Sequence, residues 1–230
     1  MTRKRVSRAR KRDLEKPDEF LSLSATLIQA LRRYRTHVAI GAVLVFASLA
    51  VYSGVRFFSS KAENRAFQLL RDNLQTYQEA ARDNAPDQAL AKVVPQFESL
   101  LADYGRRDGG KLARLVFADL NYRAGNYDTA ITHFKKVLEI LPPDHFAYGS
   151  ALSGLGYAYL ETDNRDQALV RFEQIVAGHH PQFRNDALYQ LGRLYGEQGQ
   201  TAKQKELFQR LLDEAPTYMY ADLIKRQIEG

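Results

Sequence analysis

The hydrophobic residues divide the chain into one uninterrupted apolar run and a long C-terminal part where they recur at helical spacing. The run Val38–Val55 has 18 residues without a charge. A helix of that length, rising ~1.5 Å per residue, is about 27 Å long, close to the ~30 Å hydrocarbon core of a bilayer. A soluble core helix would carry a polar stripe, and this run offers only Ser48 and Ser53. We therefore predict a transmembrane helix over residues 37–58.

The segments beside this run have different patterns. Residues 1–17 are basic and poor in large apolar residues, which predicts a disordered tail that contacts anionic lipid or RNA, or only sets topology. Residues 18–36 predict an amphipathic juxtamembrane helix, at the lipid interface or as a plain extension of the transmembrane helix. Residues 59–110 predict a helical linker, starting with a helix over 62–80, and a partial repeat.

The C-terminal part repeats itself. A large aromatic residue recurs at spacings of 37, 38 and 36, at Phe97, Phe134, Phe172 and Phe208. A helix breaker follows each one, at Gly105, Pro142, Pro181 and Pro216. A small residue precedes the last three, at Ala118, Gly156 and Gly192. This order predicts helix pairs in which the small residue allows close approach and the breaker ends the second helix.

The small–aromatic–breaker order resembles the tetratricopeptide repeat. Three units match, at Lys111–Pro142, Ala147–Pro181 and Phe183–Pro216, with a half unit at Pro95–Tyr104 and a capping helix at Tyr218–Ile228. The sequence departs from the pattern in three ways: Asn121 stands where the other units have Tyr, Gln204 stands where they have Ala, and the spacings exceed the usual ~34 residues. The fold expected is all-α, with one N-terminal transmembrane helix followed by a tetratricopeptide-type α-solenoid over residues 111–230.

Charge predicts the orientation. The net charge of the chain is +6, yet Met1–His37 holds 11 Lys and Arg against 4 Asp and Glu, and the remainder holds 22 against 23. Basic residues mark the cytoplasmic side of a membrane span. We expect a single-pass protein of the bacterial inner membrane with its N-terminus in the cytoplasm and its C-terminal domain in the periplasm. A cleaved signal peptide is the alternative, but a basic region of 37 residues before the run is too long for one.

No constellation of reactive residues stands out. The chain has no Cys, which excludes a disulfide scaffold, a thiolate nucleophile and a Cys-based zinc site. Gly105–Lys111 fits the phosphate-loop pattern, but Leu112 stands where the Mg²⁺ ligand belongs, so we interpret it as a helix-to-helix loop. His145, His179 and His180 lie at unit boundaries without a further ligand at suitable spacing. We predict no catalytic, cofactor or metal site and no enzymatic activity.

The repeat resemblance implies a binding surface, because the first helix of each unit lines a concave groove in that family. The groove candidates are Asp119, Tyr122, Arg123, Ser153, Tyr157, Glu161, Tyr189, Arg193 and Glu197. Tyr and Arg are favoured at protein interfaces, and this mixture suits an extended or partly unfolded peptide. The alternative, which is favoured for any one of these residues taken alone, is a solvated or packing position.

The anchor and repeats together resemble the ancillary subunit of the bacterial SecYEG translocon. The residues that carry this resemblance are the run Val38–Val55 and the stretch Leu112–Phe134. It implies an adaptor that contacts translocon subunits, periplasmic chaperones or unfolded chains. Two alternatives stay open: an envelope scaffold for cell division or outer-membrane assembly, and a membrane-tethered RNA-binding protein, although nucleic acid is the less favoured partner. The sequence does not fix the oligomeric state.

Overall fold

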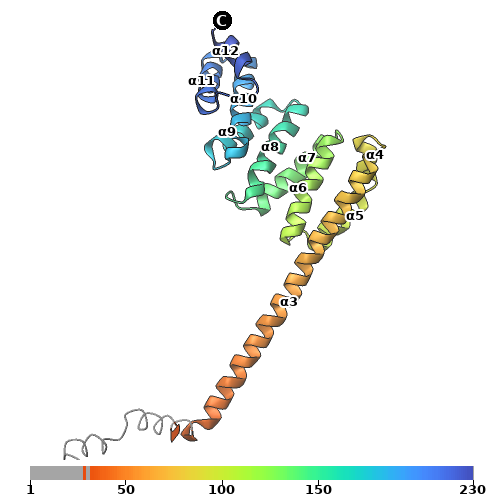
Figure 1. Cartoon of the computed structure of the whole chain (residues 1–230), viewed down its shortest axis with the longest axis vertical. Helices are drawn as coiled ribbons and strands as arrows, with labels where there is room; N and C mark the ends of the chain where they lie inside the picture. The colour runs from red at the N-terminus through yellow and green to blue at the C-terminus, as the bar shows by residue number, and fades with distance from the viewer. Residues whose placement is uncertain (1–27, 30–31, 230) are drawn as a thin grey trace, which may run out of the picture. The chain divides into compact units, whose positions relative to one another are not determined.

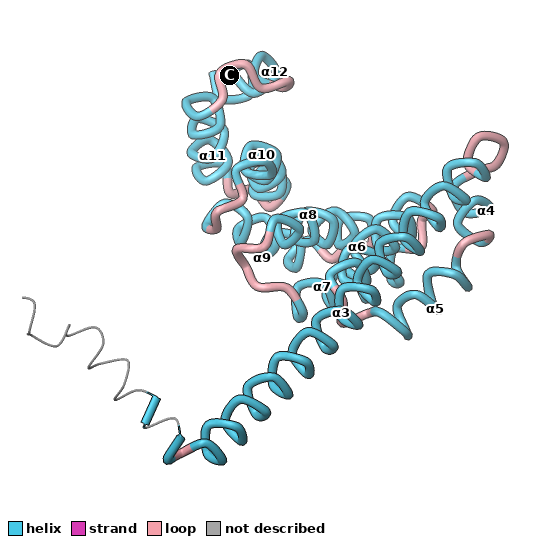
Figure 2. The backbone as a smooth tube through the Cα atoms, turned by 60° about the horizontal axis from the view of Figure 1, so that its bottom comes forward, coloured by secondary structure: helices cyan, strands magenta, loops and turns pink. Residues whose placement is uncertain are grey.

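The computed structural model describes residues 28–29 and 32–229, and every regular element longer than one turn in that part is an α-helix (Figures 1 and 2). The helices are α3 (Arg35–Ala80), α4 (Pro86–Ala91), α5 (Val94–Tyr104), α6 (Asp108–Arg123), α7 (Tyr127–Ile140), α8 (Phe146–Glu161), α9 (Arg165–Ala177), α10 (Pro181–Glu197), α11 (Thr201–Glu214) and α12 (Ala221–Glu229). The predicted tail over 1–17 and most of the predicted amphipathic helix over 18–36 lie outside the described residues.

The chain divides into two compact units, and the first ends at Ser59. Its described part is mostly residues 35–59 of α3, which we call the apolar half of α3. The side chains of this segment are exposed on all sides of the helix; Phe46 and Val51, for example, are 72% and 67% exposed. The helix is long and apolar enough to cross a membrane, and none of its most apolar 18 residues is buried. Among the described residues, this apolar segment therefore has no element packed against it, as the alternative of a soluble core helix would require.

The second unit, Ser60–Gly230, is an α-solenoid built from the helix pairs α6/α7, α8/α9 and α10/α11. The α8/α9 and α10/α11 pairs each close where a glycine meets an aromatic ring sixteen positions later in the chain. A Cβ added at Gly156 would stand 2.8 Å from the Phe172 ring, and one at Gly192 would stand 2.3 Å from the Phe208 ring. Both phenylalanines are fully buried. The spacing that predicted close helix packing is thus confirmed.

The two helices of each pair are joined by the same turn. The turn residues Gly125, Asp163 and Gly199 have φ of 78°, 57° and 74°. The next residue donates its backbone N–H to a carbonyl five positions earlier, over 2.9, 2.8 and 2.8 Å in the three units. This is the Schellman geometry that ends a helix in a left-handed residue, and two of the three turns supply the glycine that it favours.

The first repeat helix begins earlier than the sequence predicted. The segment interpreted as a loop up to Lys111 is helical from Asp108, so that expectation was wrong over its last four residues. Two contacts explain the early start. The Glu63 carboxylate of α3 accepts the backbone N–H groups of Asp108 and Gly109 at 3.2 and 2.6 Å, and a Cβ at Gly109 would stand 2.9 Å from that of Ala66. A carboxylate at a helix N-terminus accepts hydrogen bonds from otherwise unpaired N–H groups and interacts favourably with the positive end of the helix dipole.

Both positions that depart from the repeat pattern have local solutions. Asn121 is buried and donates its amide to the Phe117 carbonyl at 2.8 Å. Gln204 occupies space that Gly196 leaves open, since a Cβ on that glycine would stand 2.3 Å from the Gln204 amide nitrogen.

The capping helix was predicted from Tyr218 and begins at Ala221 instead. The preceding segment is a turn whose Tyr218 and Tyr220 rings lie 5.9 and 4.8 Å from the ring of Tyr189, so these side chains cover the end of the third repeat instead of entering the helix.

Candidate functional site

A groove of about 640 Å³ opens on the first helices of the repeats. Its walls come from the end of α3, from α6 and α8, and from Phe183 of α10. The predicted groove residues that line it are Asp119, Tyr122, Arg123, Ser153 and Tyr157. The structure thus brings five of the nine candidates to one cavity, and their role in binding stays a prediction.

The floor of the groove is apolar because of a glycine. Gly154 and the buried Phe134 both line the cavity, and a Cβ on Gly154 would stand 2.3 Å from the Phe134 ring. Leu115, Val116 and Leu120 continue the apolar surface along α6. Apolar walls with a few polar groups are typical of ligand sites.

The rim of the groove at α6 is polar and almost neutral. Arg123 pairs with Asp119 at 2.7 Å, and both side chains are largely exposed. The ring of Tyr122 lies 5.5 Å from that of Tyr127. Burial raises the pKa of the Tyr122 hydroxyl, and the nearby Glu161 carboxylate raises it further. Tyr122 therefore stays neutral at physiological pH and can donate a hydrogen bond to a ligand.

Tyr157 is held by α10. Its hydroxyl donates to Asp186 at 2.5 Å and accepts from the Gln190 amide at 3.0 Å. Burial and the hydrogen bond to Asp186 raise the pKa of Tyr157. The second and third repeats are therefore joined beneath the groove by a polar network, which fixes the ring position.

Three further candidates lie in a smaller cleft of about 320 Å³ that shares Tyr157 with the groove. Glu161, Arg193 and Glu197 line it, and Glu197 accepts from Arg165 at 2.6 Å and Arg193 at 3.4 Å. Exposed ion pairs of this kind contribute ~0–1 kcal/mol, so a charged ligand can replace them at little cost.

Tyr189, the ninth candidate, is placed outside both cavities. Its ring lies between the Phe208, Tyr218 and Tyr220 rings, at centroid distances of 6.1, 5.9 and 4.8 Å. Tyr189 is partly buried, because the turn before α12 folds over it.

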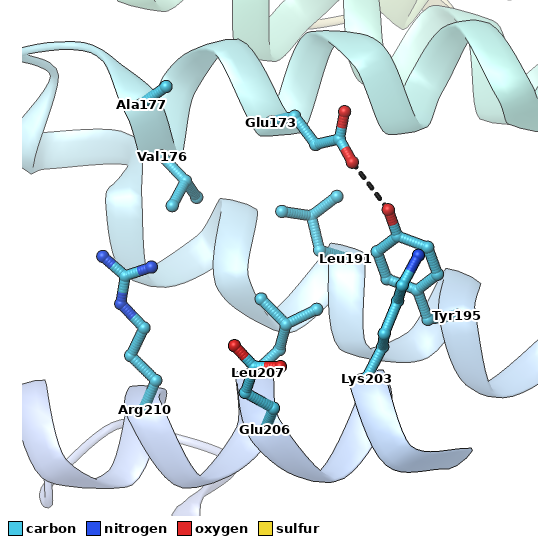
Figure 3. A pocket seen from close by; sticks show the side chains of 9 residues that line it. All are labelled: Glu173, Val176, Ala177, Leu191, Tyr195, Lys203, Glu206, Leu207 and Arg210. Carbon is cyan, nitrogen blue, oxygen red and sulfur yellow. Dashed lines mark hydrogen bonds between the residues drawn. The ribbon is translucent and has the colours of Figure 1, made fainter. Parts of the chain in front are cut away.

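The sequence did not indicate a cleft of about 470 Å³ between α9, α10 and α11 (Figure 3). Val176, Leu191 and Leu207 form its apolar base, and charged side chains surround them. The Tyr195 hydroxyl donates to Glu173 at 2.6 Å, which raises the pKa of that tyrosine to about 12. The Lys203 ammonium lies 4.6 Å from the centre of the same ring.

The histidines have packing and capping contacts. His145 caps α8 by accepting the Ala147 N–H at 3.1 Å. His180 is buried and stacks on Tyr148 at 5.8 Å, in space that Gly149 and Gly178 leave open.

Comparison with known families identifies the repeats. Tetratricopeptide repeat models match residues 112–178 and residues 186–218. The predicted tetratricopeptide repeats and their all-α solenoid are thereby confirmed. No curated protein sequence matches the chain. These matches do not show membership of the ancillary translocon subunit family, so that finer resemblance stays a prediction.

Solved structures with the same fold share little sequence with the chain. The crystal structure of MamA is 16% identical, with a TM-score of 0.53 over 70% of this chain and 82% of that chain. Repeats of a putative kinesin light chain from Podospora anserina are 16% identical, with a TM-score of 0.55 over 72% and 84%. A tetratricopeptide repeat protein from Parabacteroides merdae is 15% identical, with a TM-score of 0.58 over 70% and 59%. At these identities the likeness shows the fold alone.

Proposed function

We propose that this chain is a membrane-anchored adaptor whose repeat domain binds extended or partly unfolded polypeptide in the groove at Tyr122 and Tyr157. The observation that carries the proposal is the groove itself: an apolar floor over Phe134, a nearly neutral rim and a length that crosses two repeats. Apolar side chains of an extended segment can enter such a floor, while rim tyrosines and charges meet its backbone. A single acidic or basic motif would require an uncompensated rim of opposite charge.

The anchor in this proposal is the apolar half of α3. Moving exposed side chains such as Phe46 and Phe58 from water into the apolar membrane core would stabilise the anchor by about 1.5–3 kcal/mol each. The basic excess of Met1–His37 supports a cytoplasmic N-terminus and a periplasmic repeat domain in the bacterial inner membrane. The partners that fit this placement are translocon subunits, periplasmic chaperones and emerging chains. We further propose that the chain performs no catalysis.

Site-specific photocrosslinking tests the groove. A photoreactive amino acid replaces Tyr122 in the intact membrane protein, and the matched control replaces Lys205, which lies on the exposed face of α11. We expect crosslinks to translocon subunits, chaperones or unfolded clients from position 122 and none of these from position 205. Crosslinks only to cell-division or outer-membrane assembly proteins would support the envelope scaffold instead. Equal crosslinking from both positions would remove the groove from the proposal.

A groove variant adds an independent measurement. Ser153→Arg places a long charged side chain in the cavity beside Gly154, and Ser153 is only partly buried, so the helix can tolerate it. We expect loss of the position-122 crosslinks at unchanged thermal stability.

A further inference from the structure

A second cavity of the repeat domain, of about 810 Å³, is strongly basic. It lies between the end of α5, the start of α6 and the second half of α7. Arg106, Arg107, Arg114 and Lys136 line it, and Asp103 is the one carboxylate in the lining. Lys136 also pairs with the Glu139 carboxylate at 2.7 Å, so its charge is partly compensated within α7.

Arg114 points most directly to a ligand. Its Nε is buried and has no hydrogen-bond partner, and none of the carboxylates in the described chain lies within ion-pair distance of its guanidinium. The neighbour it does have is His133, whose Nδ1 lies 3.4 Å from Nη1. Burial lowers the pKa of Arg114, which reflects the cost of holding this cation away from water. A partly buried cation without a counter-charge is costly, and an anion in the cavity would offset that cost.

The chain tethers the end of the predicted membrane segment close to this cavity. Glu63 binds the backbone of Asp108 and Gly109, directly after Arg106 and Arg107. Glu63 follows Phe58, the end of the predicted membrane segment, by only five positions in the chain. Five residues span at most ~18 Å when fully extended, whatever the angle between the two units. Exposed Lys61 and Arg65 add to the basic charge on this stretch.

We propose that this basic cavity binds the phosphate headgroup of an anionic phospholipid and so docks the repeat domain on the bilayer surface. The inference rests on the membrane anchor of the proposed function. Anionic headgroups attract basic residues at the membrane surface, and the short tether keeps headgroups within constant reach of the cavity. An acidic protein segment has the right charge too, but it lacks this enforced proximity.

The test uses the absence of Cys, since one introduced thiol labels a single site. Ala102 is exposed and lines the cavity without contributing charge, so Ala102→Cys carries a fluorophore. The full chain is placed in nanodiscs of phosphatidylcholine alone, or with added phosphatidylglycerol, each containing a headgroup-attached quencher. We expect stronger quenching in the anionic nanodiscs and a loss of the difference at high salt.

Charge reversal gives the decisive comparison. The double variant Arg106→Glu with Arg107→Glu should lower the ratio of docked to undocked protein in anionic nanodiscs, calculated from the quenching, at least about tenfold. The control, Lys205→Glu with Lys225→Glu, changes the net charge equally on α11 and α12 and should leave the ratio unchanged. Equal quenching in both nanodiscs, or equal loss in both variants, would overturn the inference.

Two further arms distinguish a lipid headgroup from a soluble phosphate and from an acidic peptide. Competition by free glycerol phosphate in neutral nanodiscs, with no effect of phosphatidylglycerol, would assign the cavity to a soluble phosphate and overturn the lipid assignment. Binding of an acidic peptide under the same conditions would also overturn it. Alkaline extraction checks the anchor separately: if the chain leaves the membrane, the proposed function fails, whereas a retained chain that ignores phosphatidylglycerol contradicts only this inference.

Discussion

Gly192→Ala tests whether the solenoid depends on the contact between a helix backbone and a buried ring. The new Cβ would stand 2.3 Å from Cε1 of Phe208, a distance that real Cβ atoms do not show. Phe208 is fully buried, so its ring cannot leave without opening a cavity. Overpacking of this kind costs ~1–3 kcal/mol, and the better helix propensity of Ala returns about 1 kcal/mol. We expect the free energy of unfolding to fall by up to about 2 kcal/mol, which is the overpacking cost less the propensity gain.

The same helix supplies a matched control. Gly196→Ala makes the identical chemical change one turn later, where the Cβ meets the flexible end of Gln204 at 2.3 Å. That side chain can rotate away, so the propensity gain should dominate and stability should stay unchanged or rise. Phe208→Leu supplies the coupling test, because the smaller side chain leaves room for the methyl group. In that background Gly192→Ala should cost at least about 1 kcal/mol less than in the parent.

Denaturant unfolding of the full chain in mild detergent, followed by tyrosine near-ultraviolet circular dichroism, measures these differences. The chain has 13 Tyr and no Trp, and many of the tyrosines lie in the repeats. Equal changes in stability for Gly192→Ala and Gly196→Ala, or an unaltered effect of Gly192→Ala in the Phe208→Leu background, would show that the Phe208 ring does not limit this site.

Three more predictions concern the contacts that hold the solenoid. Glu63→Ala removes the carboxylate that caps α6 and should cost about 0.5–2 kcal/mol, against no change for Glu79→Ala elsewhere on α3; hydrogen exchange of the first turn of α6 should rise only in the former. Arg184 and Arg210 lower the pKa of Glu214 to about 2, so this group contributes stability above its ordinary pKa of 4.5 that is lost as the pH falls toward 2; acid titrations of unfolding should therefore show a smaller decline for Glu214→Gln than for the parent, and an identical decline would contradict the ion pairs. Asp163→Gly should raise the melting temperature, because glycine adopts the left-handed conformation of this turn without strain. Gly125→Ala should lower the free energy of unfolding by about 1–2 kcal/mol for the same reason, although the new Cβ would meet nothing within 4 Å. Unchanged stability in Gly125→Ala would show that the turn is not held in this geometry.

The periodic part of the fold could be predicted from the sequence because its determinants lie a fixed number of residues apart. Gly156 with Phe172 and Gly192 with Phe208 are such pairs, and each contact lies within one unit. The aromatic spacing alone is therefore sufficient to locate the helix pairs along the chain. Asn121 weakened the pattern without breaking the fold, because its amide returns to its own helix backbone.

Contacts between distant segments could not be predicted in the same way. Glu63 meets α6 across more than forty residues, and nothing local distinguishes it from the other carboxylates on α3. The compensation between Gly196 and Gln204 is similarly invisible until the two helices are placed together. Tyr189 followed the helical register of the other candidates, but the turn at Tyr218–Tyr220 covers it. Placement on a helix face was predictable, while the presence of a covering segment was not.

Protease protection on spheroplasts, with one tag at each end of the chain, tests the central claim of a membrane-anchored periplasmic adaptor most directly. We expect protease added outside to remove the C-terminal tag, while the N-terminal tag survives until the cells are lysed. A C-terminal tag that stays protected until lysis would place the repeat domain in the cytoplasm, and the chain would not be a periplasmic adaptor.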